Sequence, residues 1–142
     1  RKAPFFDDIE NLVIDYFNDQ ESLVFKRNVK FIEKVLKELD IEVKWKFSSD
    51  LDIQNDGNLM NLEITKKLGG DAYLSGSGAD EYQEIEPFKV ENIELKISDF
   101  DPTTYSYNQF NNKGEFQAGL SIIDAISNIG FAGIKDLVHL NQ

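Results

Sequence analysis

Three short stretches with strand-like patterns are separated by segments of helical length, and this order limits the folds open to the chain. Apolar and charged residues alternate over 41–47, a short apolar run covers 72–74, and apolar residues alternate again over 93–97. Such alternation is typical of half-buried strands. Because strands joined by helical crossovers pair in parallel, we predict an α/β fold. It has a small parallel three-stranded sheet built from βαβ units with helices packed on it, expected to belong to a larger sheet in the full-length protein.

Apolar residues recur at helical spacing in the segments between these stretches. The pattern predicts one helix after Pro4, a second from an N-cap at Ser22 to about Asp40, and a third over 59–68. Further helices are predicted over 80–88 and 120–129, with a last helical turn from 133 to 140. Lysines line one face of the second helix, which indicates a solvated surface or, as the alternative, a basic docking surface.

Composition excludes several classes of function. The 142 residues hold 15 Lys and Arg against 26 Asp and Glu, a net charge of −11, with one His and no Cys. A groove for nucleic acid needs clustered cations, so no nucleic-acid partner is expected, and disulfides, thiolate nucleophiles and Cys-ligated zinc are impossible. Without a membrane-span pattern or secretory signal, we expect a cytoplasmic protein with a single domain over 1–142. Since Arg1 opens the chain and Met60 is its only methionine, we also expect a fragment.

The junction after the second strand-like stretch is the most informative segment. Ser75-Gly76-Ser77-Gly78 links that stretch to the predicted helix, and backbone N–H groups at such a junction can converge on a ligand, with serine hydroxyls as further donors. In open parallel sheets, ligands bind beyond the carboxyl ends of strands. The alternative interpretation is a structural turn capped by one of the serines.

Two carboxylates, Asp99 and Asp101, follow the third strand-like stretch and flank Phe100. At the same sheet edge they could act as an acid–base pair or, with Glu81, hold a divalent cation through oxygen ligands. The alternative is an Asx-type turn that leads into Pro102. We predict no metal site.

Several ordered segments resemble the WbqC-like proteins. The run from Thr65 to Ala79, followed by Tyr82, is similar to the family's YLSG-G signature, and residues 119–130 are similar to its closing NLSIIDLLFNCG segment. The resemblance extends from about Pro4 to Gly130. The family's N-terminal opening is absent here, so we expect the chain to correspond to a C-terminal portion of the family. Asp80 stands where the family is usually basic, and Ile129 stands where it has cysteine.

The resemblance implies a bacterial protein of O-antigen or other surface-polysaccharide biosynthesis, with a proposed role in attaching glycine or another aminoacyl group to a sugar. It also implies substrate-binding roles for a set of positions in this chain. These are Tyr73, Ser75, Gly76, Gly78, Tyr82, Asp124 and Asn128, to which the junction argument adds Ser77. Ser121 belongs to the same matched segment as Asp124 and Asn128, and the alternative for it is a helix cap with Asp124 at N3.

Two hypotheses follow. The first is an accessory enzyme that transfers an aminoacyl or acyl group to a sugar, with Ser75, Asp99 and Asp101 as catalytic residues and a sugar or aminoacyl donor as partner. The second is a non-catalytic binding or scaffolding domain, or an incomplete half of an enzyme, in which an exposed sheet edge allows self-association. The sequence indicates no particular cofactor.

Overall fold

The computed structural model describes residues 3–76, 78, 83–110 and 114–139. The chain divides into two compact units, which are described separately. Unit 1 comprises residues 1–43 and 101–142, and unit 2 comprises residues 44–100. The prediction of a single domain therefore stays a prediction.

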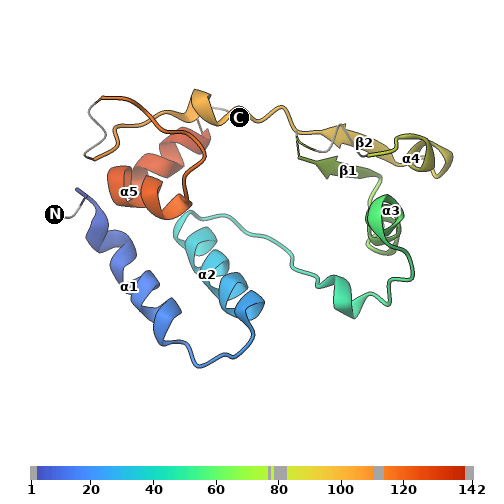
Figure 1. Ribbon diagram of the computed structural model, residues 1–142, viewed down its shortest axis with the longest axis horizontal. Coiled ribbons are helices and arrows are strands. Elements are labelled where there is room, and N and C mark those ends of the chain that lie inside the picture. Colours follow the sequence, from blue (N-terminus) through green and yellow to red (C-terminus); the bar gives the residue numbers. More distant parts are fainter. Residues whose placement is uncertain (1–2, 77, 79–82, 111–113, 140–142) are drawn as a thin grey trace. The chain divides into compact units, whose positions relative to one another are not determined.

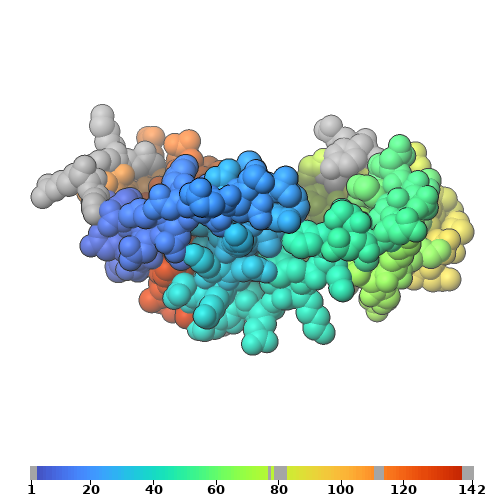
Figure 2. Space-filling model, turned by 90° about the horizontal axis from the view of Figure 1, so that it is seen from below, coloured from blue at the N-terminus to red at the C-terminus, as the bar shows by residue number. Residues whose placement is uncertain are grey.

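Unit 1 is built from helices (Figure 1). Helix α1 spans Phe6–Asn18, α2 spans Val24–Glu38, the short 3-10 helix η3 spans Pro102–Tyr105, and α5 spans Ile122–His139. Helix α1 packs against both α5 and α2, and Figure 2 shows α1 and α2, in blue, side by side on one face. Within the described residues, no helix combines the length and apolar character needed to cross a bilayer.

The core of unit 1 comes from the apolar stripes of these helices. Ile9 and Ile126 are fully buried, and Val35, Leu39 and Ile134 join them in one cluster. The opposite face of α2 is exposed, as predicted, and two of its lysines form ion pairs with α1 and the segment after it: Lys34 with Asp15, and Lys30 with Asp19. The predicted apolar stripe matches this core only in part: Leu39 belongs to it, but Phe25 and Ile32 are 49% and 43% exposed.

The start of α2 differs from the prediction. Leu23 occupies the N-cap position, without a capping side chain, so the predicted cap at Ser22 is wrong. The Glu21 carboxylate instead accepts a hydrogen bond from the Leu23 N–H at 3.1 Å. A glutamate side chain is long enough to reach a backbone N–H two residues away. The Glu21 carboxylate thus satisfies an N–H group at the start of α2 that has no partner within the helix.

Gly130 interrupts α5, at the position where the sequence predicted a helix to close. Its backbone angles are φ 69° and ψ 173°, and a β-carbon at this position would lie 2.9 Å from Cδ1 of Phe5. The Phe5 N–H also donates to the Ser127 carbonyl at 2.9 Å. Only glycine combines this left-handed conformation with so close an approach.

Unit 2 contains a two-stranded sheet and the helices around it. The 3-10 helix η1 spans Ser48–Asp50, α3 spans Gly57–Lys67, β1 spans Ala72–Ser75, α4 spans Glu86–Val90 and β2 spans Glu94–Ile97. The strands are parallel, with Ala72 opposite Glu94 and Ser75 opposite Ile97. The crossover between them contains α4, as a βαβ unit requires. Phe88, Leu62 and Ile93 form the core, packed against Tyr73 and Leu95.

The predicted third strand over 41–47 is wrong, because the described residues form a sheet of only two strands, β1 and β2. Ile41, Val43, Trp45 and Phe47 are 37–48% exposed, and side chains from this part of the chain, in teal, stand clear of the surface in Figure 2. Alternation shows which side chains share a face, but a strand also needs a partner for its backbone groups. The fold is thus α/β with a two-stranded parallel sheet. Helix α4 covers only part of the predicted helix 80–88, of which residues 80–82 lie outside the described residues.

Candidate functional site

A hydrogen-bonded cluster joins α5 to residues 107–110 and 114–117 of unit 1, which we call the segment 107–117. The Asp124 carboxylate accepts from the Tyr107 hydroxyl at 2.7 Å and from the Gln109 amide at 3.0 Å through one oxygen. Its other oxygen accepts from the Asn128 amide at 3.2 Å. Asn128 also accepts from the Phe110 N–H. Because Asp124 and Asn128 lie four residues apart on one helical face, both can hold the same segment.

The donors of this cluster are all engaged in hydrogen bonds within the protein. Burial, together with the hydrogen bond to Asp124, raises the pKa of Tyr107 to about 12 from its ordinary value near 10, and at neutral pH its hydroxyl is a donor in either case. The Gln109 amide group also donates to the Gln117 carbonyl at 3.0 Å, and its oxygen accepts from the Gln117 N–H at 2.8 Å. Asp124 and Asn128 therefore position the segment 107–117, which is a structural role that the predicted binding role did not include.

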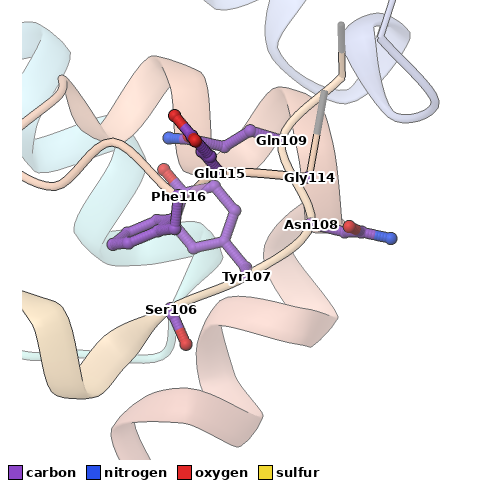
Figure 3. Close-up of a pocket in the computed structure, with 7 residues that line it drawn as sticks. All are labelled: Ser106, Tyr107, Asn108, Gln109, Gly114, Glu115 and Phe116. Carbon is purple, nitrogen blue, oxygen red and sulfur yellow. The ribbon is translucent and has the colours of Figure 1, made fainter. Parts of the chain in front are cut away.

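Two pockets open on the segment that this cluster holds, and we call them the loop pockets. The first measures about 350 Å³, and its lining residues are Ser106, Tyr107, Asn108, Gln109, Gly114, Glu115 and Phe116. In Figure 3 the Gln109 and Glu115 side chains extend in the same direction above the Phe116 and Tyr107 rings. The second measures about 390 Å³, and its lining residues are Pro4, Asn108, Gln109, Phe110 and Asn128. The predicted residue Asn128 thus does border a pocket.

Asn108 is a candidate binding residue that the sequence reasoning missed. It lines both loop pockets, it is exposed, and its side chain makes no hydrogen bond to the part of the chain that is described. The Phe110 side chain, 40% exposed, lines the second pocket. The dense run of amides around Phe110 was the available signal, but amides are also common in ordinary loops, so spacing alone could not single out Asn108.

The predicted glycine junction lies in unit 2, at the carboxyl end of β1. Ser75 is buried, and its hydroxyl donates to the Gln83 side-chain oxygen at 2.7 Å. The Asn58 amide donates to the Glu84 carbonyl at 3.0 Å. Two buried atoms here, Nε2 of Gln83 and Oδ1 of Asn58, have no hydrogen-bond partner among the residues that the structure describes. Unsatisfied buried polar atoms are uncommon in folded proteins. A ligand at this edge could therefore offer an acceptor to Nε2 of Gln83 and a donor to Oδ1 of Asn58.

The other predicted residues of this junction divide into three groups. Tyr73 stacks on the core residue Phe88, with ring centroids 5.6 Å apart, so its ring serves packing. Gly76 and Gly78 are exposed, and a β-carbon on either would meet nothing within 4 Å. Ser77 and Tyr82 lie outside the described residues.

The two predicted catalytic aspartates fall in different units. Asp99 belongs to unit 2 and is exposed, whereas Asp101 belongs to unit 1. Asp101 accepts from the Thr103 hydroxyl at 2.7 Å and from the Thr103 N–H at 2.9 Å, which is the Asx-type turn weighed as the alternative. The Thr103 hydroxyl and N–H together lower the pKa of Asp101. The shared edge with the glycine junction stays a prediction. In the described parts of the chain, no three His, Cys, Asp or Glu side chains gather closely enough to hold a metal ion.

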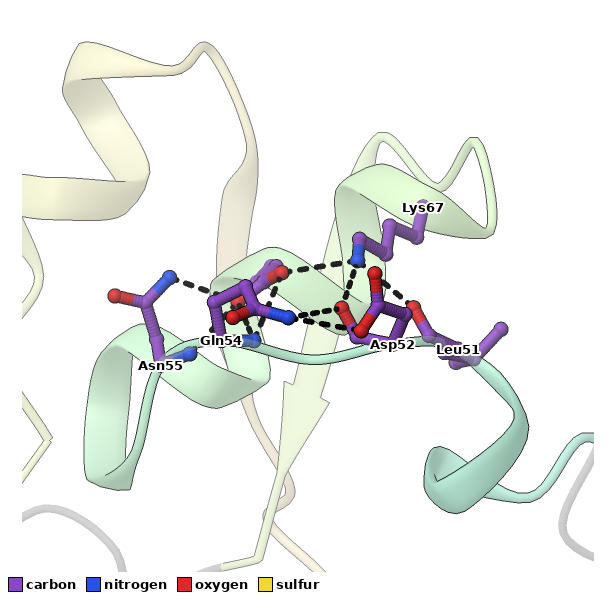
Figure 4. A network of polar contacts seen from close by, with 6 residues as sticks. Leu51, Asp52, Gln54, Asn55 and Lys67 are labelled. Atoms are coloured by element: carbon purple, nitrogen blue, oxygen red, sulfur yellow. Dashed lines mark hydrogen bonds and ion pairs between the residues drawn. The ribbon is translucent and has the colours of Figure 1, made fainter.

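A second polar cluster, in unit 2, surrounds Glu63 of α3 (Figure 4). The Glu63 carboxylate accepts from the Asn55 side-chain amide at 2.7 Å and from the backbone N–H groups of Gln54 and Asn55 at 3.0–3.2 Å, and it pairs with Lys67 at 3.1 Å. These bonds, foremost the one from the Asn55 side chain, lower the pKa of Glu63 to about 2. The cluster fixes the segment before α3 and leaves no carboxylate oxygen for a ligand.

We expect Glu63 to make unit 2 acid-sensitive. A carboxyl group whose pKa is lowered in the folded state stabilises that state above its unfolded pKa, and the contribution is lost as pH falls toward the folded value. The stabilisation should therefore be full above about pH 4.5 and should disappear toward pH 2. Urea unfolding at several pH values should show the gap between the wild type and Glu63→Gln closing over this range. Glu33→Gln, on an exposed face of α2, should leave the pH profile unchanged, and a gap that stays constant with pH would contradict the assignment.

Comparison with known proteins adds one finding. The family model described as the WbqC-like protein family matches residues 1–136. The match covers nearly the whole chain, so the expectation that only a C-terminal portion of the family is represented is not supported. No curated protein and no solved structure matches the chain.

Proposed function

The chain belongs to the WbqC-like protein family, and we propose that it serves surface-polysaccharide biosynthesis of the O-antigen type by binding a sugar in the loop pockets. The family resemblance supports the polysaccharide context. The lining supports the sugar, because amide groups donate and accept hydrogen bonds and so match sugar hydroxyls. An exposed aromatic ring such as Phe110 offers an apolar face for the C–H groups of a pyranose.

The observation that carries this proposal is the position of Asn108. Its amide is shared by both loop pockets and has no hydrogen-bond partner in the described part of the chain. The amides around it are committed to the protein: Gln109 bonds to Asp124 and Gln117, and Asn128 bonds to Asp124 and Phe110. Held in this way, the segment presents Asn108 on a preorganised surface, which reduces the entropy lost on binding.

Asn108→Ala should weaken sugar binding about fivefold to tenfold, the value of one hydrogen bond of about 1 kcal/mol or slightly more. The measurement is an NMR titration of the chain with the neutral methyl glycosides of common hexoses, in which the Asn108 side-chain amide signals should shift. Asn11→Ala removes an exposed asparagine of α1 in the same unit and serves as the control. Equal affinities for the wild type and Asn108→Ala would refute this role for Asn108, and the absence of any sugar binding would refute the function.

A second candidate function is the transfer of glycine or another aminoacyl group to a sugar, and the sheet edge of unit 2 favours it through its capacity for the aminoacyl group. An aminoacyl group carries an amine donor and a carbonyl acceptor, which are complementary to Oδ1 of Asn58 and Nε2 of Gln83, two atoms without a partner in the described part of the chain. In a titration with glycinamide, the Gln83 amide signals should shift and those of Asn108 should not.

The catalytic roles of Ser75, Asp99 and Asp101 stay predictions. The Ser75 hydroxyl donates to an amide oxygen, which does not take up a proton at neutral pH. The Asp101 carboxylate accepts a hydrogen bond from Thr103 within the Asx-type turn, and its lowered pKa makes it a weaker base. These contacts favour the non-catalytic alternative, in which the chain binds a sugar and a partner provides the chemistry.

A further inference from the structure

We infer that unit 1 carries a phosphate-binding site between α1 and α2, built around the guanidinium group of Arg27. The ligand class is a phosphorylated small molecule, of which this site holds the phosphate group. The inference goes beyond the proposed sugar-binding function, because the loop pockets share no lining residue with this site. It also gives a specific role to the basic face of α2, for which the sequence left a docking surface open.

The first argument is that Arg27 has hydrogen-bonding capacity that the protein does not use. Its Nε atom is buried and has no hydrogen-bond partner among the described residues. Its two terminal nitrogens also donate no hydrogen bond within that part of the chain. A guanidinium group carries five N–H donors, and a buried polar atom without a partner is uncommon in folded proteins. Unused donors on a cation favour an anionic ligand.

The second argument is that packing holds this guanidinium group in place. Cζ of Arg27 lies 5.6 Å from the centroid of the Tyr16 ring, a cation–π contact between α2 and α1, which lie side by side in Figure 2. Tyr16 is itself fixed, because its hydroxyl donates to Oδ1 of Asn28 at 2.7 Å and its ring meets the Phe31 ring edge-on. A stacked arginine loses little further freedom on binding, and its planar fork matches two oxygens of a phosphate.

The third argument is that the neighbouring carboxylates pair with lysines rather than with Arg27. Lys30 pairs with Asp19 and Lys34 with Asp15, each at 2.8 Å. The five charged groups together leave one positive charge in excess, although the whole chain has a net charge of −11, and the local field decides where an anion binds. The two lysine side chains are 52% and 48% exposed, and ion pairs this exposed cost little to break. Either ammonium group is therefore free to join Arg27 on a bound phosphate.

A small pocket beside Arg27 sets the size of the group that binds. It measures about 40 Å³, and the five charged side chains named above all line it. A single water needs roughly 10–15 Å³ of such space, so the pocket admits a group of a few atoms and leaves the rest of the ligand in solvent. A phosphate group offers oxygens for both the Arg27 fork and a lysine, whereas the fork alone uses both oxygens of a carboxylate.

The test is an NMR titration of the full chain with inorganic phosphate, glucose 6-phosphate and acetate at constant ionic strength. The sequence contains only two arginines, Arg1 and Arg27, so the Arg27→Lys variant identifies the Nε–H signal of Arg27, which should shift with both phosphates until it saturates. Arg27→Gln should weaken their binding about tenfold, and Arg27→Lys nearly as much, because an ammonium group cannot contact two oxygens as the fork does. Lys37→Gln removes a charge at an exposed position of the same helix and should leave the affinity unchanged. Acetate should bind more weakly than either phosphate.

Three outcomes would overturn the inference. Wild-type affinity in Arg27→Gln or in Arg27→Lys would show that the guanidinium group is not the centre of a site. Acetate that binds as tightly as phosphate would overturn the choice of ligand. Binding of inorganic phosphate without binding of glucose 6-phosphate would overturn the assignment to a phosphorylated molecule. None of these results affects the proposed function, which is tested with neutral glycosides at the loop pockets.

Discussion

Phe88→Ala is expected to destabilise unit 2 by about 3–5 kcal/mol, the usual cost of removing a fully buried phenylalanine. Phe88 is 0% exposed, and it joins α4 to the sheet by packing with Leu62, Ile93 and the Tyr73 ring. A unit of this size has a small core, and a loss of this magnitude approaches the total stability of a small domain. We therefore expect the parallel pairing of β1 and β2 to be lost in the variant under mild denaturing conditions.

Amide hydrogen exchange is the measurement that resolves this effect. Protection should fall at the backbone groups that pair the two strands, such as the Ser98 N–H that donates to Ser75 and the Glu94 N–H that donates to Asp71. Val90→Ala is the control, because Val90 belongs to the same helix but is 71% exposed. If Phe88→Ala changes protection no more than Val90→Ala does, Phe88 is not the centre of this core.

Asp124→Ala is expected to destabilise unit 1 by about 3 kcal/mol and to abolish sugar binding in the loop pockets. A hydrogen bond to a charged group is worth about 1.5–3 kcal/mol, and this carboxylate accepts from Tyr107, Gln109 and Asn128. Without it, the segment 107–117 loses its main attachment to α5, so Asn108 is no longer held in place. The loss of binding thus follows from the loss of position rather than from a lost contact with the ligand.

Two measurements separate this effect from general unfolding. Urea denaturation gives the change in stability, and the glycoside titration, made well below the denaturation midpoint, gives the change in affinity. Asp136→Ala is the matched control, since Asp136 lies on the same helix and is exposed. Retention of full affinity in folded Asp124→Ala would show that the pockets do not depend on this cluster.

Local patterns predicted most of the secondary structure. The helix after Pro4, the helix ended by Gly69, both strands of the sheet and the break at Gly130 all depend on residues close together in sequence. Glycine at positive φ and apolar residues at helical period act within a few residues of themselves. The prediction of a strand over 41–47 failed because a strand forms only where a second strand lies beside it, and residues close together in sequence do not determine that.

The candidate site was only partly accessible to this reasoning. The resemblance implied that Asp124 and Asn128 bind a substrate, which stays a prediction. In the structure both hydrogen-bond to the protein's own residues near 107–110, and this could not be read from their spacing. Asn108 gave no distinct signal, because its importance depends on which neighbouring amides are already bonded. That distribution of hydrogen bonds is a property of the folded segment.

The amino-acid sequence by itself determined the α/β class, the parallel crossover with α4, the acidic character and the family, because composition, periodicity and ordered motifs need no knowledge of distant contacts. Only the tertiary structure decided which polar groups are hydrogen-bonded within the protein and which are left for a ligand. Asp124 and Asn128 are separated by many residues from the segment that they hold. A hydrogen bond between such residues exists only once helix packing has brought α5 and that segment together.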